Sequence, residues 1–164
     1  MRGGEALRRQ LDVRASTIQR ATGAKGWHAQ LRYLTRSQVG RDAMTRVFTP
    51  RTLIAWLAED RAPNKANQAA IQRAYDVRRK PAVTEALKRV LNNDGNGTRV
   101  EVHPEESKWT DHLDVQQIEI TEWDDIIDAW ADNDYDELND IWEGIADDEL
   151  YPPGGYYYVS HLGF

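Results

Sequence analysis

The stretch TPRTLIAWLAEDRAPNKA, residues 49–66, contains the clearest helix signals in this sequence. Thr49 is a preferred N-cap residue, and Pro50 suits the first position of a helix, where a backbone N–H has no intrahelical partner. These two residues predict a helix that begins at residue 50. Apolar side chains at helical spacing predict that one face of this helix packs against a core. The residues expected on the packed face are Leu53, Ile54, Trp56 and Leu57.

The opposite face of this helix carries side chains suited to contacts with DNA bases. Arg51 offers a guanidinium, whose paired donors match O6 and N7 of guanine, and Thr52 offers a hydroxyl that can contact several base edges. A helix that presents its first turn to the major groove is the reading element of a helix-turn-helix. The residues that we assign to base reading are Thr49, Arg51, Thr52 and Ala55.

The same stretch resembles the lambda-repressor-like (XRE-type) family of helix-turn-helix proteins. In that family, a Thr-Ile/Val-x-x-Trp core lies on the recognition helix, and a proline seven residues after the Trp opens the next helix. The positions that match this pattern are Thr52, Leu53, Trp56 and Pro63. Glu59 and Asp60 differ from the family, which usually turns through a glycine there. The resemblance covers about residues 35–77 and implies a DNA-binding helix-turn-helix at about 37–58.

The first helix of the pair is expected at 37–46, with a turn at Val47 and Phe48. Ala43 is the small residue expected to let the helices approach. The side chains expected to point inward are Val39, Ala43, Met44 and Val47. The runs R-T-L-x-x-W-L from residue 51 and R-x-P-x-K-A-N from residue 61 also resemble helix-turn-helix proteins of actinobacterial plasmids, mobile elements and telomere ends.

Positive and negative charges are segregated along the chain. Residues 1–91 hold 19 Lys and Arg against 7 Asp and Glu, a net charge of +12, whereas residues 92–164 hold 2 against 20, a net charge of −18. The basic part suits the phosphate backbone of DNA, and the acidic part cannot lie on DNA unaided. The cations that we assign to phosphate contacts are Arg36, Arg41, Arg46, Arg61, Lys65, Arg78, Arg79 and Lys80.

The hydrophobic periodicity changes near the same place. Residues 1–91 show helical spacing in several segments, and a helix that runs from about residue 63 to Tyr75 is followed by a restart at Pro81. The segment NNDGNGT, 92–98, has turn-forming residues and no core residues, and it predicts a linker.

Beyond the linker, residues 99–103 and 117–121 alternate between apolar and polar as half-buried strands do. Thr121 is then expected to cap an amphipathic helix, a second helix follows, and residues 156–162 suit a last strand. The predicted fold class is therefore a mainly α N-terminal helix-turn-helix domain over residues 1–91, followed by a small acidic α+β domain over residues 99–164.

The sequence also indicates which classes of protein and site are not expected. The sequence has no cysteine, no apolar run long enough to span a membrane and no recognised catalytic motif, so we expect a cytoplasmic, nucleoid-associated protein that is not an enzyme. Aspartates at 132, 134 and 136 and Glu143 have the spacing of an EF-hand, but Glu137 stands where the loop needs glycine. This favours a polar bend between helices, and no metal or cofactor is expected.

The expected function is sequence-specific DNA binding, as a transcriptional regulator whose acidic module mediates dimerisation, partner binding or autoinhibition. One alternative is an accessory protein of plasmid or telomere replication or partition that binds DNA ends. Another is a protein-interaction or DNA-mimic module in which the acidic half is the active surface. The expected partners are double-stranded DNA, a second copy of the chain as a homodimer, and a basic protein for the acidic half.

Overall fold

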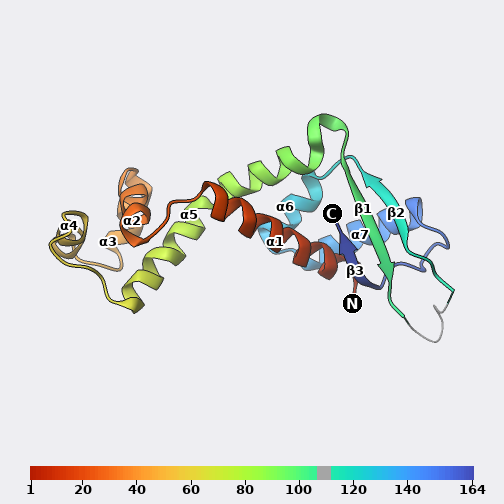
Figure 1. Cartoon of the computed structure of the whole chain (residues 1–164), viewed down its shortest axis with the longest axis horizontal. Helices are drawn as coiled ribbons and strands as arrows, with labels where there is room; N and C mark the ends of the chain where they lie inside the picture. The colour runs from red at the N-terminus through yellow and green to blue at the C-terminus, as the bar shows by residue number, and fades with distance from the viewer. Residues whose placement is uncertain (107–111) are drawn as a thin grey trace. The chain divides into compact units, whose positions relative to one another are not determined.

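The computed structural model describes residues 1–106 and 112–164. These residues form seven α-helices and a three-stranded antiparallel sheet (Figure 1). The expected combination of many helices with one small sheet is confirmed. The chain divides into two compact units, which we call the basic unit, Gln19–Ala82, and the acidic unit, Met1–Ile18 with Val83–Phe164.

These units differ from the predicted domains, because residues 1–18 and 83–91 belong with the acidic half. Leu7 in the first segment and Leu87 in the second are fully buried in the same core as the strands. Charge suggested a boundary near residue 92, but charged side chains lie on surfaces, whereas buried apolar side chains decide which segments fold together.

Residues 92–98 are accordingly not a linker between domains. They include a short 3-10 helix, Asn93–Gly95, and lead directly into the first strand of the acidic unit. Gly97 is buried with a φ of 73°, and a Cβ there would lie 2.4 Å from the carbonyl oxygen of Ile120. The segment is a tight reversal inside one unit.

The basic unit is built from helices. It contains the end of α1 (Gly3–Thr22), then α2 (Trp27–Thr35), α3 (Gln38–Thr45), α4 (Pro50–Leu57) and the first part of α5 (Lys65–Asn92). Its core consists of Leu31, Leu34, Met44, Leu53, Trp56, Ile71 and Tyr75.

The predicted restart at Pro81 is wrong, since α5 continues through this proline to Asn92. A proline inside a helix leaves the carbonyl four residues earlier without its usual N–H partner. Pro81 and Val77 are both exposed, so water can reach that carbonyl, which lowers the cost of the missing bond.

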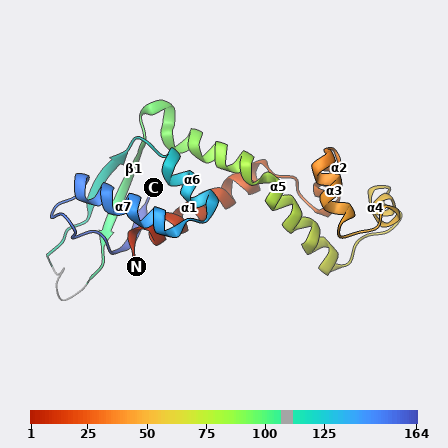
Figure 2. The ribbon, with the colours of Figure 1, turned by 180° about the vertical axis from the view of Figure 1, so that it is seen from behind.

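The sheet of the acidic unit has the strand order β2-β1-β3 and is antiparallel throughout. The strands are β1 (Thr98–Pro104), β2 (Gln116–Ile120) and β3 (Val159–Gly163), so the three predicted strands are present. Alternate residues such as Val100 and Val102 are fully buried against the helices of this unit. Figures 1 and 2 show α1, α6 (Asp124–Asp132) and α7 (Tyr135–Glu149) beside the sheet.

The cap of α6 differs from the prediction, which assigned it to Thr121. The helix begins at Asp124, and the backbone N–H of Trp123 donates to Oδ1 of Asn92 at 2.8 Å. The amide of Asn92 also donates to Asp124 at 2.7 Å. Trp123 is the N-cap residue, and its N–H is held by a residue 31 positions earlier in the sequence, at the end of α5.

The EF-hand spacing does not correspond to a calcium loop. The side chain of Asp134 caps α7 by accepting from the backbone N–H of Glu137 at 3.0 Å, so Asp136 and Glu143 lie on the helix itself. Among the described residues, no group of three or more acidic or histidine side chains could hold a metal ion.

Two glycines allow the start of α1 to pack closely against α7. A Cβ on Gly3 would lie 2.0 Å from the ring of Trp142, and a Cβ on Gly4 would lie 2.6 Å from the backbone nitrogen of Asn139. The preceding backbone pairs with the start of β3, since the N–H of Val159 donates to the carbonyl of Met1 at 2.9 Å. The first residues are thus an integral part of the acidic unit.

We expect Gly4→Ala to lower the free energy of unfolding by about 1–3 kcal/mol, because the added methyl meets backbone atoms that cannot move aside locally. Gly144→Ala is the matched control, since Gly144 lies in α7 with nothing within 4 Å of an added Cβ. It should stabilise the protein by about 0.5–1 kcal/mol through helix propensity. Urea unfolding of both variants measures the two effects, and the same sign for both would contradict the close approach.

Candidate nucleic-acid interface

The predicted start of α4 is confirmed. Pro50 is its first residue, and the side chain of Thr49 accepts from the backbone N–H of Thr52 at 3.3 Å. α3 is capped in the same way, with the hydroxyl of Ser37 accepting from the N–H of Gly40 at 3.1 Å. Local side chains thus fix both helix starts in the segment predicted as a helix-turn-helix.

The inner face of α4 is anchored by two side chains. Leu53 and Trp56 are 6% and 3% exposed, and the ring of Trp56 packs edge-on against Phe48 with ring centroids 4.8 Å apart. α4 packs on α2, and His28 of α2 bonds the carbonyl of Leu57 through Nε2 at 3.0 Å. This anchoring holds one face of α4 against the unit.

The outer face of α4 includes a residue that was expected in the core. Ile54 is 67% exposed, and it shares this face with Arg51, three residues earlier. Because Leu53 and Trp56 fill the contact with the core, the neighbouring position at about 100° around the helix is left in solvent. Thr52 and Ala55 are half-buried, so the centre of the exposed face lies at the predicted Arg51 and at Ile54 rather than at Thr52 and Ala55.

The hydroxyl of Thr52 already has protein partners. Thr49 donates to its Oγ1 at 2.9 Å, and Arg61 donates to the same oxygen at 3.3 Å. The structure therefore brings together three predicted site residues, two base readers and one phosphate contact. Their contacts are with one another and brace the start of α4 against the segment that follows it.

The other predicted phosphate contacts fall into two groups. Arg41 donates to the carbonyl of Thr35 at 3.0 Å, and Arg79 donates to Thr22 at 2.7 Å, so both are engaged within the unit. Lys80 is half-buried and also has a partner. Of the cations predicted to contact DNA, those that are exposed and make no side-chain hydrogen bond or ion pair within the described residues are Arg36, Arg46, Arg51, Lys65 and Arg78.

Arg32 is a cation that the sequence assignment missed. It is exposed on α2 and lines a surface pocket together with His28 and Arg36. Arg32 lies four residues before Arg36, the C-cap residue of α2, and this spacing places the two guanidiniums on one face of the helix. The spacing is visible in the sequence and could have identified Arg32.

The predicted packing of α3 needs correction. Val39 and Val47 are 66% and 61% exposed, and Ala43 is not the residue of closest approach. That residue is Gly40, where a Cβ would lie 1.9 Å from the carbonyl oxygen of Leu34. α3 therefore lies against the end of α2 through a glycine, and Met44 supplies its buried anchor.

The basic unit carries 13 Lys and Arg against 4 Asp and Glu, a net charge of +9. Its acidic side chains do little to neutralise the arginines, because Glu59 pairs with His28 at 3.1 Å and Asp42 accepts from Gln38 at 2.7 Å. No protein-family model, curated protein or solved structure matches this chain.

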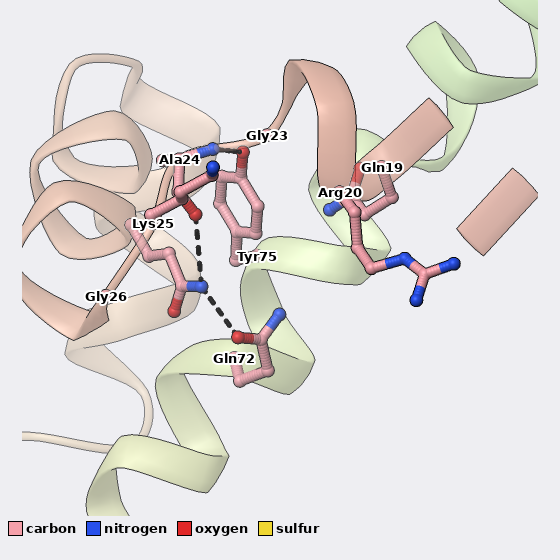
Figure 3. Close-up of a pocket in the computed structure, with 9 residues that line it drawn as sticks. Gln19, Arg20, Gly23, Ala24, Lys25, Gly26, Gln72 and Tyr75 are labelled. Carbon is pink, nitrogen blue, oxygen red and sulfur yellow. Dashed lines mark hydrogen bonds between the residues drawn. The ribbon is translucent and has the colours of Figure 1, made fainter. Parts of the chain in front are cut away.

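A pocket of about 430 Å³ lies beside the loop that leads into α2 (Figure 3). The buried amide of Gln30 donates to the carbonyl of Ala24 at 3.4 Å and to Gln72 at 2.6 Å. The hydroxyl of Tyr75 accepts from the N–H of Ala24 at 2.6 Å. These hydrogen bonds hold the loop to α5, and through them the polar groups satisfy one another. The same contacts hold α2 in place.

The turn after α4 contains a strained residue. Glu59 stands where the resembled family usually has a glycine, and its φ is 61°, in the left-handed region that costs a residue with a side chain about 1 kcal/mol or more. Its carboxylate pairs with Nδ1 of His28, which is the compensating contact in this unit.

We expect Glu59→Gly to be more stable than Glu59→Ala by about 1 kcal/mol. Both substitutions remove the pair with His28, so their difference isolates the backbone strain. Urea unfolding, with amide exchange of α4 as the report on this unit, measures the difference. An alanine variant as stable as the glycine variant would mean that the turn relaxes.

Trp56→Ala should lower the free energy of unfolding of the basic unit by about 3–5 kcal/mol, because it removes the largest buried anchor of α4. Ile54→Ala on the same helix is the control, and we expect a change within about 0.5 kcal/mol because its side chain is mostly in solvent. The same exchange measurement tests both variants. A large loss for Ile54→Ala would show that this residue packs in solution.

Proposed function

We propose that the basic unit binds double-stranded DNA as a helix-turn-helix, and that the protein is a sequence-specific transcriptional regulator. In this proposal, α3 and α4 are the two helices and α4 is the recognition helix. The outward face of α4 carries the proposal, because Arg51 and Ile54 are exposed there one turn apart while Leu53 and Trp56 anchor the opposite face.

The two exposed side chains offer complementary ways to read bases. The guanidinium of Arg51 has no partner within the described part of the chain and can donate two hydrogen bonds to O6 and N7 of guanine. Ile54 can contact the methyl group of thymine, which is the apolar feature of the major groove. A reading face of this kind favours a site that contains both a G·C and an A·T pair.

The charge of the basic unit supports binding to the DNA backbone. Its exposed cations include Arg32 on α2, Arg51 on α4 and Arg78 on α5, and Arg46 lies in the turn between α3 and α4. Such contacts release counterions, so affinity should fall steeply as salt rises. The half-buried Thr52 and the engaged Arg61 are better placed to hold α4 than to contact DNA in the conformation described.

Selection of random duplexes on the full chain tests the proposal. The full chain is required because residues 1–18 and 83–91 complete the core of the acidic unit. Enrichment of one motif supports the proposal, and a palindrome would further support the expected homodimer. A preference for ends or hairpins would favour the accessory role in replication, and no enrichment would reject sequence-specific binding.

Arg51→Ala should weaken binding to the enriched duplex by about 1–3 kcal/mol and leave binding to a scrambled duplex nearly unchanged. Arg78→Ala is the matched control, since Arg78 is an exposed arginine on α5 and is expected to contact phosphate only. It should weaken binding to both duplexes equally. Gel shifts with the two duplexes measure this, and equal losses for Arg51→Ala would make it a phosphate contact.

A further inference from the structure

The acidic unit holds 23 Asp and Glu against 8 Lys and Arg, a net charge of −15. Some of these carboxylates have partners: Lys88 donates to Asp128 at 2.7 Å, and Arg2 donates to Glu143 at 2.8 Å. The hydrogen bond that Lys88 donates to Asp128 raises the pKa of Lys88. Asp128 on α6 and Glu143 on α7 are thus each paired with a cation of the same unit.

One group of carboxylates has no cationic partner within the described part of the chain. A groove of about 290 Å³ is lined by the end of β2, the start of α6 and one side of α7. Its apolar lining is provided by the half-buried Ile141 and Ile145, one turn apart on α7, with Ile126 buried beneath. The acidic residues of its rim are Glu119, Glu122, Asp125 and Glu149.

These four rim residues are exposed, and in the described part of the chain none of them makes an ion pair or a side-chain hydrogen bond. None of the described residues that line the groove is a Lys, Arg or His. Four like charges around one apolar groove repel each other, and a cation placed among them would relieve this repulsion. The lining therefore combines an apolar floor with an unneutralised acidic rim.

A lysine or arginine side chain matches both parts of this lining. Its methylene stem can lie on the isoleucines while its charged end bonds the carboxylates of the rim. The groove is slightly smaller than the roughly 300–1,000 Å³ typical of small-molecule sites, so it suits one or two side chains of a larger partner. A second acidic unit is a poor occupant, because two surfaces of the same sign repel.

We propose that this groove binds a segment of a partner protein in which lysine and arginine flank an apolar side chain. The inference does not depend on DNA binding by the basic unit, and its test contains no DNA. The groove lies wholly within the acidic unit, so its occupation requires no change elsewhere in the chain.

The test uses the full chain labelled with ¹⁵N and the capped peptide Arg-Lys-Leu-Arg-Lys. We expect its addition to shift the backbone amides of residues 119–126 and 141–149. The peptide Arg-Lys-Ser-Arg-Lys should bind more weakly because it lacks the apolar side chain, and Glu-Glu-Leu-Glu-Glu should not bind. Shifts spread over all acidic surfaces, equal binding of the leucine and serine peptides, or no shifts would each overturn the proposal.

Charge reversal supplies matched protein variants. Glu122→Lys with Glu149→Lys should raise the Kd for the leucine peptide about tenfold, because like charges then face the peptide. Asp132→Lys with Asp136→Lys makes the same change of net charge at exposed positions of α6 and α7 outside the groove. This control should change the Kd less than about twofold if binding is local, since solvent screens charges beyond about 10 Å.

Equal weakening by the two double variants would overturn the groove as the site. If charge reversal impairs folding, Glu122→Gln with Glu149→Gln provides a neutral and nearly isosteric pair, which should still weaken binding severalfold. Groove amides that shift with protein concentration in the absence of peptide would identify a second copy as the occupant and would also overturn the proposal.

Discussion

The close contact between the start of α1 and α7 is the constraint on which the acidic unit depends. It exists because Gly3 and Gly4 lack side chains where Trp142 and the backbone at Asn139 approach. The contact brings Ala6, Leu7 and Leu11 into a core whose other buried residues come from Val83 onward. The basic unit consequently lies in the sequence between two segments of the acidic unit, and both of its ends belong to helices that extend into that unit.

The sequence was most informative where a structural signal is local. The start of α4 depends on Thr49 and Pro50, which act on neighbouring backbone groups, and the alternation of the strands depends only on which residues face the core. Signals from distant residues were missed. The start of α6 is held by Asn92, and no pattern near Thr121 reveals that the helix begins later and bonds a distant residue.

The candidate interface was also predicted only in part, because some of its contacts are local in sequence and others are not. Arg51 follows directly from its place in the first turn of α4, and its exposure agrees with that assignment. Ile54 was assigned to the core because a hydrophobic side chain is usually buried. The number of α4 side chains that are buried depends, however, on how much of α4 contacts α2. The engagement of Thr52 by Arg61 joins residues nine positions apart across a turn, a contact that a helical pattern does not encode.

The order of segments in the chain also determines what a single backbone cut would produce. A protease that cleaves one exposed bond within Gln19–Ala82 would leave Met1–Ile18 and Val83–Phe164 on different polypeptides. The acidic unit would then be a complex of two chains, held by Leu7, Leu11 and their partners without a covalent link. Its folding would become bimolecular, and its stability would fall on dilution, as it does for an obligate dimer.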